Sequence, residues 1–417
     1  MKSYIIEGGR KLEGTVKISG SKNASLPILA GTILNGNSNK LYNVPNIKDT
    51  KITLQILKLL GCKIKRNGDK IEINSKNMTK TEIPEHLMRE MRSTVILAGA
   101  ILGRFKEVTF SYPGGCDIGA RPIDLHLNAL KKMGVDIVED AGFIRCKANK
   151  IFGANIDLDF PSVGATENIL LAAVNAEGIT VINNAAMEPE IVDLTNFLKK
   201  MGAKIYGAGT KCITIKGVKK LSGVSHNIMS DRIEAGTILC AVAGSGGVVT
   251  VENIEPEYLS SVINKLEECG SEIKTYKNSI YLKAPKKLKP TDIKTMPYPG
   301  FPTDMQQIFS AMLTRATGTS IVVENIFESR YKFFAELRKM GAKVTIEGKT
   351  AIISGVRKLN GTSTICTDLR GGAALIVAGI MAKGKTKIEN IDYILRGYEN
   401  IDKKLNSIGA KIQIEEK

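Results

Sequence analysis

Six segments of the chain are apolar on nearly every side and rich in small residues. A helix with this composition has no polar face to present to water, so we expect it to be buried. Segments of this kind recur along the whole chain, at 26–34, 93–102, 166–176, 233–244, 305–316 and 371–382. The pattern therefore predicts six buried helices at regular intervals, which is typical of a protein built from internal repeats.

An amphipathic helix, a glycine and a short strand follow each apolar segment. We expect each glycine to adopt the left-handed conformation that closes a helix. The glycines lie 68 to 73 residues apart and are Gly61, Gly134, Gly202, Gly270, Gly341 and Gly409. The chain is therefore predicted to have an α/β fold of six repeats, each about 70 residues long.

The ends of the repeats predict how the chain is divided. Repeats three and five end in similar phrases, at 213–223 and 352–361, whereas the sixth repeat reaches Lys417 without one. The chain begins with this phrase instead, at 5–14. We therefore expect residues 1–21 to complete the sixth repeat. This gives one lobe of three repeats over 22–229 and a second over 1–21 plus 230–417, and a cleft between similar lobes is a common ligand site.

Composition and charge narrow the possible functions. The 417 residues are 43% hydrophobic and 24% charged, no apolar run reaches the length of a membrane span, and the N-terminus lacks the apolar core of a signal peptide. Seven scattered cysteines without a Cys-x-x-Cys pair favour a reducing cytoplasm. The net charge of +17 fits either a dispersed lysine coat or a polyanionic ligand, such as nucleic acid or a small phosphorylated substrate.

Several of the predicted buried helices start with a cation, where a positive charge opposes the helix dipole. The four cationic starts are at Lys22, Arg92, Arg232 and Arg370. A bound anion would offset both the dipole and the cation, so the pattern favours a shared anion-binding site. Helix capping is the alternative at each start. Asp304 and Gln307 fit a capping box, and Asp368 and Ser162 fit N-caps.

The segment 112–122 differs from the simple turns of the other repeats, because it holds three glycines and two prolines around one cysteine and one arginine. This composition predicts a mobile loop that can close over a site. Cys116, with Arg121 nearby, is a candidate acid or nucleophile, and an incidental turn cysteine is the alternative that spacing alone favours. The other six cysteines are expected to fill the core. His126 is expected to be a helix surface residue rather than the edge of a site.

Four motifs together resemble the UDP-N-acetylglucosamine enolpyruvyl transferases (1-carboxyvinyltransferases) of the EPSP synthase-like superfamily. The motifs are Ser21-Lys22-Asn23-Ala24, 113–122, 299–304 and Thr367-Asp368-Leu369-Arg370. The resemblance spans the chain and implies an inside-out α/β barrel of two three-repeat lobes. It also implies transfer of the enolpyruvyl group of phosphoenolpyruvate to the 3-hydroxyl of UDP-N-acetylglucosamine. The reaction proceeds by addition and elimination through a tetrahedral ketal and opens peptidoglycan synthesis.

The resemblance implies roles for individual residues. Cys116 would protonate the methylene carbon of phosphoenolpyruvate, could carry a covalent adduct, and is alkylated in this family by the epoxide fosfomycin. Asp304 would deprotonate the sugar hydroxyl. Lys22, Arg121 and Arg396 would bind the phosphate of phosphoenolpyruvate.

Further implied contacts concern the carboxylate and the nucleotide sugar. Arg330 and Arg370 would hold the carboxylate of phosphoenolpyruvate, which suits a planar guanidinium. Asn23 would orient the sugar, and Arg92 would add charge near the nucleotide or phosphate. The remaining implied substrate contacts are Pro122, Ile123, Asp124, Leu125, Ser162, Val163, Gly164, Ile326 and Asp368. Phe160 stands where some members of the family carry a lysine near the nucleotide diphosphate.

The resemblance implies no cofactor, no metal, no nucleic acid and no membrane insertion, with phosphoenolpyruvate as a co-substrate. Two other functions remain alternatives. One is the sister reaction on shikimate 3-phosphate, against which the Gly-Gly-Cys loop argues. The other is a basic ring of six repeats that binds nucleic acid, which the charge permits but which would not require Cys116 or Asp304.

Overall fold

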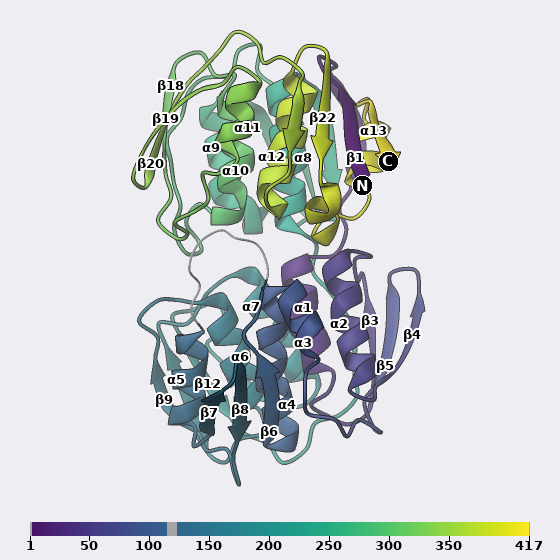
Figure 1. Ribbon diagram of the computed structural model, residues 1–417, viewed down its shortest axis with the longest axis vertical. Coiled ribbons are helices and arrows are strands. Elements are labelled where there is room, and N and C mark those ends of the chain that lie inside the picture. Colours follow the sequence, from purple (N-terminus) through teal and green to yellow (C-terminus); the bar gives the residue numbers. More distant parts are fainter. Residues whose placement is uncertain (1, 115–122, 417) are drawn as a thin grey trace. The chain divides into compact units, whose positions relative to one another are not determined.

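The computed structural model describes residues 2–114 and 123–416 (Figure 1). The predicted site residues Cys116, Arg121 and Pro122 lie outside these described residues. The chain divides into two compact units. Within the described residues, the first unit comprises 20–114 and 123–229, and the second unit comprises 2–19 and 230–416.

The structure confirms the six buried helices. In the first unit they are α1 (Lys22–Gly31), α4 (Ile96–Phe105) and α6 (Val163–Ala173), and in the second unit α8 (Arg232–Ser245), α10 (Thr303–Leu313) and α12 (Leu369–Met381). Helices α8, α10 and α12 pack against one another, and α4 packs against both α1 and α6 (Figure 1). Each unit thus has its own hydrophobic core around its buried helices.

The amphipathic helices and their terminal glycines are also confirmed. These helices are α2 (Lys48–Leu59), α5 (Asp124–Lys132), α7 (Pro189–Lys200), α9 (Ser260–Glu268), α11 (Phe334–Lys339) and α13 (Ile401–Ser407). The glycine after each has a positive φ, between 84° at Gly134 and 110° at Gly61. A residue with a Cβ would be strained there, which explains why glycine recurs at this point of every repeat. Short helical turns are α3 (Glu85–Glu90), η1 (Arg92–Val95), η2 (Pro256–Leu259) and η3 (Ile391–Arg396).

Each repeat contributes three antiparallel strands to one sheet, and five of the six sheets gain a fourth, parallel edge strand. In the first unit the sheets have the strand orders β13-β3-β5-β4, β6-β8-β7 and β11-β12-β10-β9. Their bounds are β3 (Ser38–Tyr42), β4 (Lys63–Asn67), β5 (Lys70–Asn74), β6 (Glu107–Ser111), β7 (Asp136–Asp140), β8 (Phe143–Lys147), β9 (Asn155–Asp157), β10 (Ile179–Asn183), β11 (Lys204–Tyr206), β12 (Cys212–Lys216) and β13 (Ser225–Asn227).

In the second unit the strand orders are β15-β16-β14-β2, β17-β18-β20-β19 and β21-β22-β1-β23. Their bounds are β1 (Lys2–Glu7), β2 (Leu12–Lys17), β14 (Gly247–Glu252), β15 (Glu272–Tyr276), β16 (Ser279–Lys283), β17 (Ile293–Lys294), β18 (Thr319–Val323), β19 (Lys343–Glu347), β20 (Thr350–Ser354), β21 (Ser363–Ile365), β22 (Lys385–Glu389) and β23 (Ile412–Glu416).

The N-terminal strands separate, which corrects part of the sequence prediction. Strand β1 pairs antiparallel with β22 and β23, so it completes the sixth repeat as predicted. Strand β2 instead runs parallel to β14 in the sheet of the fourth repeat. The physical reason is that a chain leaving one repeat covers the open edge of the next sheet, as β13 does beside β3. Each unit therefore closes its ring of three repeats.

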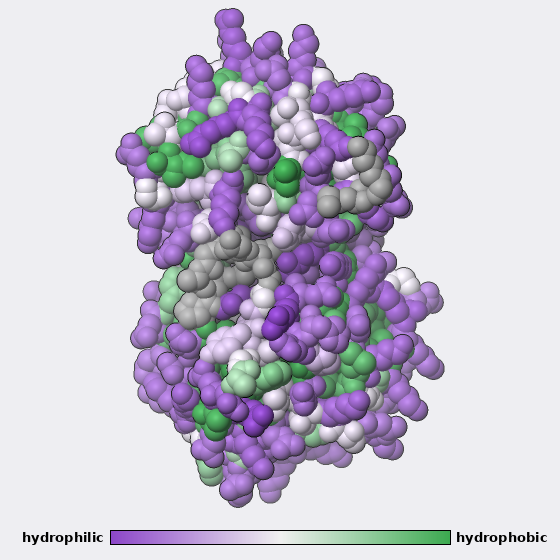
Figure 2. Space-filling view, viewed as in Figure 1, coloured by the Kyte–Doolittle hydropathy of each residue, from purple (hydrophilic) through white to green (hydrophobic). Residues whose placement is uncertain are grey.

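Hydrophilic residues cover most of the face shown in Figure 2, in keeping with the dispersed charges of the sequence. Within the described part of the chain, no helix is long and apolar enough to cross a membrane. Five of the cysteines expected in the core are buried, but Cys212 is exposed. That prediction was wrong because Cys212 is the first residue of β12, where the alternating strand pattern turns it outward.

Candidate active site

The first turn of α10 places a carboxylate between two arginines of the second unit. Asp304 Oδ1 accepts a hydrogen bond of 2.8 Å from Arg330 Nη2, and its Oδ2 accepts one of 2.9 Å from Arg370 Nη2. Arg370 is the second residue of α12, and Arg330 lies in the turn before α11. Residues from three separate segments of the sequence thus meet at one carboxylate.

Both guanidinium groups are removed from water, and the two arginines are each 3% exposed. Burial is the largest influence and opposes the charge on Arg370, but Asp304, Tyr398 and Asp231 together hold the pKa of Arg370 above its ordinary value. Among the described residues, three buried nitrogens of this pair find no hydrogen-bond partner, namely Arg330 Nε and Arg370 Nε and Nη1. Buried donors of this kind are costly unless a ligand satisfies them, so the pair is suited to an incoming anion.

Asp368 has the capping role that the sequence suggested, whereas Asp304 does not. Asp368 is the N-cap of α12 and accepts bonds from the amides of Arg370 and Gly371 at 3.0 and 2.9 Å. The N-cap of α10 is Pro302, so the predicted capping box is wrong. Gln307 instead donates to Asp368 Oδ2 at 3.1 Å and accepts from Arg330 at 3.3 Å. Asp304 therefore faces the two arginines instead of capping the helix, because two cations attract its carboxylate more strongly than one backbone amide does.

Two further predicted residues of the second unit lie in turns. The amide of Ile326 donates to Glu324 Oε1 at 2.8 Å, so a ligand contact through this backbone would use its carbonyl. Glu324 also accepts from Thr303 at the start of α10, at 3.0 Å. Arg396 is the last residue of η3 and is partly buried.

In the first unit, the start of α1 carries a cation beside a buried acid. Ser21 caps the helix by accepting from the amide of Ala24, and Lys22 Nζ lies 3.3 Å from Asp49 Oδ2. The side chain of Lys22 is 14% exposed and that of Asp49 only 1%. Asn23, also in the first turn, is partly buried. Sequence analysis missed Asp49, because a single acid at the start of α2 has the appearance of an ordinary helix residue.

Glu167 is a second buried acid near this cation. It is 3% exposed, and burial raises its pKa well above the ordinary value, with further contributions from the charges of Glu190 and Glu188. Lys22 acts in the opposite direction. No sequence pattern indicates this acid, since it lies within the apolar pattern of α6.

The prediction for His126 was wrong, because it is 8% exposed rather than a surface residue. It lies on the apolar face of α5, which packs against α6. Asn168 Nδ2 lies 3.0 Å from its Nδ1, and a Cβ added to Gly164 would meet its Cε1 at 3.2 Å. Burial, assisted by the charge of Arg92, lowers the pKa of His126 to about 4, so the ring is neutral at pH 7.

The other residues of the first unit that were predicted to bind substrate lie at or near the starts of η1, α5 and α6. Arg92 begins η1 and is half-buried, and burial lowers its pKa. Ser162 is the N-cap of α6 as predicted, accepting from the amide of Ala165 at 3.3 Å. The rest comprise Ile123, which is buried, Asp124, which is exposed, and Leu125, Val163 and Gly164, which are partly buried. Phe160 is 42% exposed. Among the described residues, no group of three or more His, Cys, Asp and Glu side chains is placed to hold a metal.

Known proteins resemble the chain over its full length. The family described as EPSP synthase (3-phosphoshikimate 1-carboxyvinyltransferase) matches residues 6–405. UDP-N-acetylglucosamine 1-carboxyvinyltransferase 2 of Caldanaerobacter subterraneus subsp. tengcongensis is 50% identical over 413 residues, covering 99% of each chain. The UDP-N-acetylglucosamine 1-carboxyvinyltransferase of Geotalea uraniireducens is 47% identical, again over 99% of each chain.

Solved structures show the same fold at lower identity. The enolpyruvyl transferase NikO from Streptomyces tendae matches with a TM-score of 0.89 at 22% identity, covering 99% of this chain and 98% of that one. EPSP synthase from Acinetobacter baumannii matches with a TM-score of 0.76 at 18% identity, covering all of both chains. The fold, the family match and the full-length identities agree. The chain belongs to the UDP-N-acetylglucosamine 1-carboxyvinyltransferases, within the EPSP synthase family.

Proposed function

We propose that the protein transfers the enolpyruvyl group of phosphoenolpyruvate to the 3-hydroxyl of UDP-N-acetylglucosamine in the cytoplasm, as the first committed step of peptidoglycan synthesis. The hydroxyl oxygen adds to C2 of phosphoenolpyruvate while C3 gains a proton, which gives a tetrahedral ketal. Loss of a proton from C3 and of inorganic phosphate from C2 then leaves the enol ether. Every atom of the two products is accounted for by UDP-N-acetylglucosamine and the co-substrate phosphoenolpyruvate, so the proposed reaction requires no cofactor.

The observation that carries the proposal is the carboxylate held between two buried guanidinium groups. Asp304 neutralises one of the two charges of Arg330 and Arg370, so a positive charge is left over. The carboxylate of phosphoenolpyruvate would offset this charge and accept from the three guanidinium nitrogens that have no partner. Arginine suits this task better than lysine, because its planar fork matches a carboxylate.

The same arrangement supports Asp304 as the base for the sugar hydroxyl. A carboxylate that accepts from two guanidinium groups holds its charge too firmly to take a proton readily. Once the substrate carboxylate shares those guanidinium groups, Asp304 becomes a better proton acceptor. Its side chain is 25% exposed, more than either arginine, so a hydroxyl has room to approach it. Substrate binding would in this way prepare the base.

The remaining roles rest on the family resemblance and on local environment. Cys116 would protonate C3 and could form a covalent adduct, and Arg121 would join Lys22 and Arg396 at the phosphate. The Lys22 ammonium, held by Asp49, is fixed in direction and suited to a phosphate. Asn23 would orient the sugar.

The nucleotide sugar would contact both neutral and charged residues of the first unit. The proposed contacts are Arg92, Pro122, Ile123, Asp124, Leu125, Ser162, Val163 and Gly164, together with the Ile326 carbonyl. Asp368 would act through the amides and the Gln307 side chain that it holds.

Phosphate release from phosphoenolpyruvate tests the proposal, with UDP-N-acetylglucosamine or shikimate 3-phosphate as the acceptor. We expect release with the nucleotide sugar alone, and loss of release in Cys116→Ser. Cys212→Ser is the matched control, because it removes an exposed thiol elsewhere and should leave the rate unchanged. Release with the shikimate ester would assign the sister reaction. A folded protein that releases phosphate with neither acceptor would contradict the proposal.

A further inference from the structure

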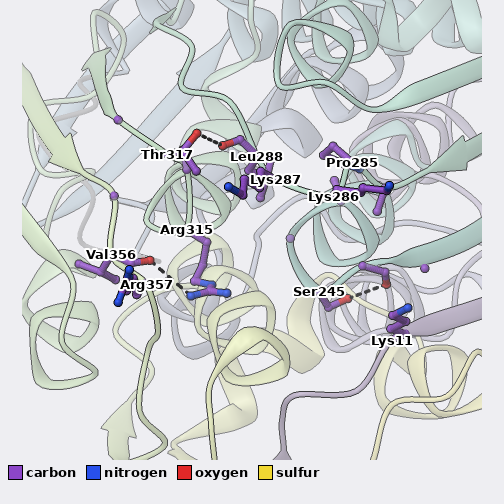
Figure 3. A pocket seen from close by; sticks show the side chains of 18 residues that line it. Lys11, Ser245, Pro285, Lys286, Lys287, Leu288, Arg315, Thr317, Val356 and Arg357 are labelled. Atoms are coloured by element: carbon purple, nitrogen blue, oxygen red, sulfur yellow. Dashed lines mark hydrogen bonds between the residues drawn. The ribbon is translucent and has the colours of Figure 1, made fainter.

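A second cationic site lies within the second unit, where α8 and α10 end. A cavity of about 920 Å³ opens there. Its lining includes five cationic side chains and neither an acidic nor an aromatic one. The cations are Lys11, Lys286, Lys287, Arg315 and Arg357. In the view of Figure 3, Arg315 and Arg357 lie on one side, Lys11 and Lys286 on the other, and Lys287 between them.

These charges are not neutralised within the described chain. None of the five cations appears in an ion pair among the described residues. Arg315 Nη1 donates to the carbonyl of Val356 at 3.3 Å, but its Nε is buried without a partner. Burial lowers the pKa of Arg315, with no carboxylate to offset the effect. A partly buried guanidinium with a spare donor and four cationic neighbours favours an anionic ligand.

The first unit provides an internal comparison, because its third repeat has the same backbone arrangement. Val356 donates to the carbonyl of Thr314, as Val218 does to that of Val174. Arg315 therefore corresponds to Asn175, whose Nδ2 donates to the Val218 carbonyl at 3.1 Å. Asparagine thus satisfies the same carbonyl without a charge, so the cation of Arg315 is not needed for this contact.

A neighbouring position also makes the second unit more positively charged than the first. Thr317 and Glu177 are equivalent, because their amides bond the carbonyls of Leu288 and Ile151. In the first unit Glu177 pairs with Lys150 at 3.0 Å. In the second unit the acid is replaced by a threonine whose hydroxyl donates to Leu288, and the corresponding Lys287 has no such partner.

The residues at the end of the buried helix also differ between the compared repeats, those that contain α4 and α8. Near its C-terminal end, α4 carries Arg104, whose guanidinium donates to the carbonyls of Ile33 and Ser75 at 2.8 and 2.9 Å. Helix α8 ends at Ser245 and is followed by Gly246, and both of these small residues line the cavity. The end of α8 therefore contributes small, uncharged residues to the cavity, and its cations come from other segments of the second unit.

We infer that this cavity binds a small polyanion of the phosphate-ester class that carries two or more phosphate groups, at a site separate from the Asp304 arginine pair. Its volume lies within the range of small-molecule sites and exceeds what one inorganic phosphate requires. The absence of an aromatic side chain from its lining argues against recognition by base stacking. Recognition would rest on charge-assisted hydrogen bonds from Arg315, Arg357 and the lysines.

Calorimetric titration with inorganic tripolyphosphate tests the inference, using the full chain at low ionic strength. We expect saturable binding that weakens about tenfold in Arg315→Asn, the scale of one charge-assisted hydrogen bond. This substitution copies Asn175 and keeps the bond to Val356. Lys219→Gln is the matched control, since it removes the charge at the position equivalent to Arg357 in the first unit, and it should leave binding unchanged. Should Arg315→Asn not fold, Lys287→Gln with Arg357→Gln removes two exposed charges of the cavity instead.

A substitution at the proposed phosphoenolpyruvate site, to which Lys22 belongs, identifies where the tripolyphosphate binds. Lys22→Gln should leave the Arg315-dependent binding intact, and methyl resonances of Leu288 and Val356 should shift on titration. Three results would overturn the inference. These are no saturable binding in the wild type, equal weakening by Arg315→Asn and Lys219→Gln, and loss of all binding in Lys22→Gln without shifts at Leu288 and Val356.

Discussion

The two units build the same ring of repeats but begin their buried helices differently. In the first unit the caps of α1 and α6 are the hydroxyls of Ser21 and Ser162. In the second unit the caps of α8 and α12 are the carboxylates of Asp231 and Asp368, each accepting from two backbone amides. The apolar helices and the closing glycines are shared, so they determine the fold, whereas the first turns vary with the chemistry.

The two units also differ in which charged side chains they bury. The second unit buries Arg232, Arg330 and Arg370 to 6% exposure or less. The first unit leaves Arg92 half-buried and buries a neutral pair, His126 and Asn168. These arginines of the second unit are thus more deeply buried than Arg92, and the acids that the first unit buries include Asp49 and Glu167.

The largest expected effect comes from removing the carboxylate between the two arginines. Asp304→Asn should lower kcat about 10²- to 10⁴-fold, the range for loss of a general base. Asp49→Asn, which removes the acid beside Lys22 in the first unit, should chiefly raise the KM for phosphoenolpyruvate. Steady-state kinetics with circular dichroism as a folding control separate these outcomes. Equal losses of kcat in both variants would contradict the assignment of the base to the second unit.

The arginine fork is the next feature to test. Arg370→Lys should raise the KM for phosphoenolpyruvate about tenfold or more, because a lysine cannot bond a carboxylate at two points. Arg338→Lys is the matched control, since Arg338 is exposed and donates to the backbone carbonyl of Val344 in the same unit. An unchanged KM in Arg370→Lys would mean that the substrate carboxylate binds elsewhere.

Acid should destabilise the first unit through His126. Its pKa in the folded chain is about 4, below the ordinary 6.5, so the unfolded chain binds the proton more tightly. Stability is therefore complete above about pH 6.5 and falls as the pH drops toward 4, by about 3 kcal/mol for this group. His126→Gln should remove that part of the acid sensitivity in urea unfolding at pH 7 and pH 4. An identical pH dependence in the wild type and the variant would show that the ring is not buried and neutral.

Two buried glutamates should respond in opposite ways to amide substitution. Burial raises the pKa of both Glu167 and Glu234, but Glu234 is held by Lys404 and by the amide of Ser19. Ionising Glu167 costs stability as the pH rises through its raised pKa, so Glu167→Gln should stabilise the protein at pH 8 more than at pH 5. Glu234→Gln should destabilise it by about 3 kcal/mol, because Lys404 loses its buried carboxylate partner. Thermal melts at both pH values check this pair, and a matching response of the two variants would refute the contrast.

Periodicity in the sequence was sufficient to predict the repeats. The apolar segments and the glycines after the amphipathic helices reflect local requirements, namely burial on all sides and a positive φ, and each appears at the expected place. The position of β2 could not be predicted, because edge pairing depends on which sheet edge is open in space.

The site was predictable residue by residue only where a motif carried it. Asp304, Arg330 and Arg370 were named from the family resemblance, but their meeting at one carboxylate is a tertiary contact without a local signal. Asp49 and Glu167 have no motif at all. His126 was misjudged because a polar residue on the apolar face of α5 is expected at the surface unless a partner such as Asn168 compensates it.

The most direct test of the central claim is to follow the carbon of phosphoenolpyruvate. Phosphoenolpyruvate labelled with ¹³C at C2 and C3 is incubated with the wild-type protein and UDP-N-acetylglucosamine, and the product is examined by NMR. The account predicts a vinyl ether whose labelled C2 is joined through oxygen to C3 of the sugar, with one phosphate released per ether formed. Label recovered only in pyruvate, or in unchanged phosphoenolpyruvate with folded protein, would contradict it.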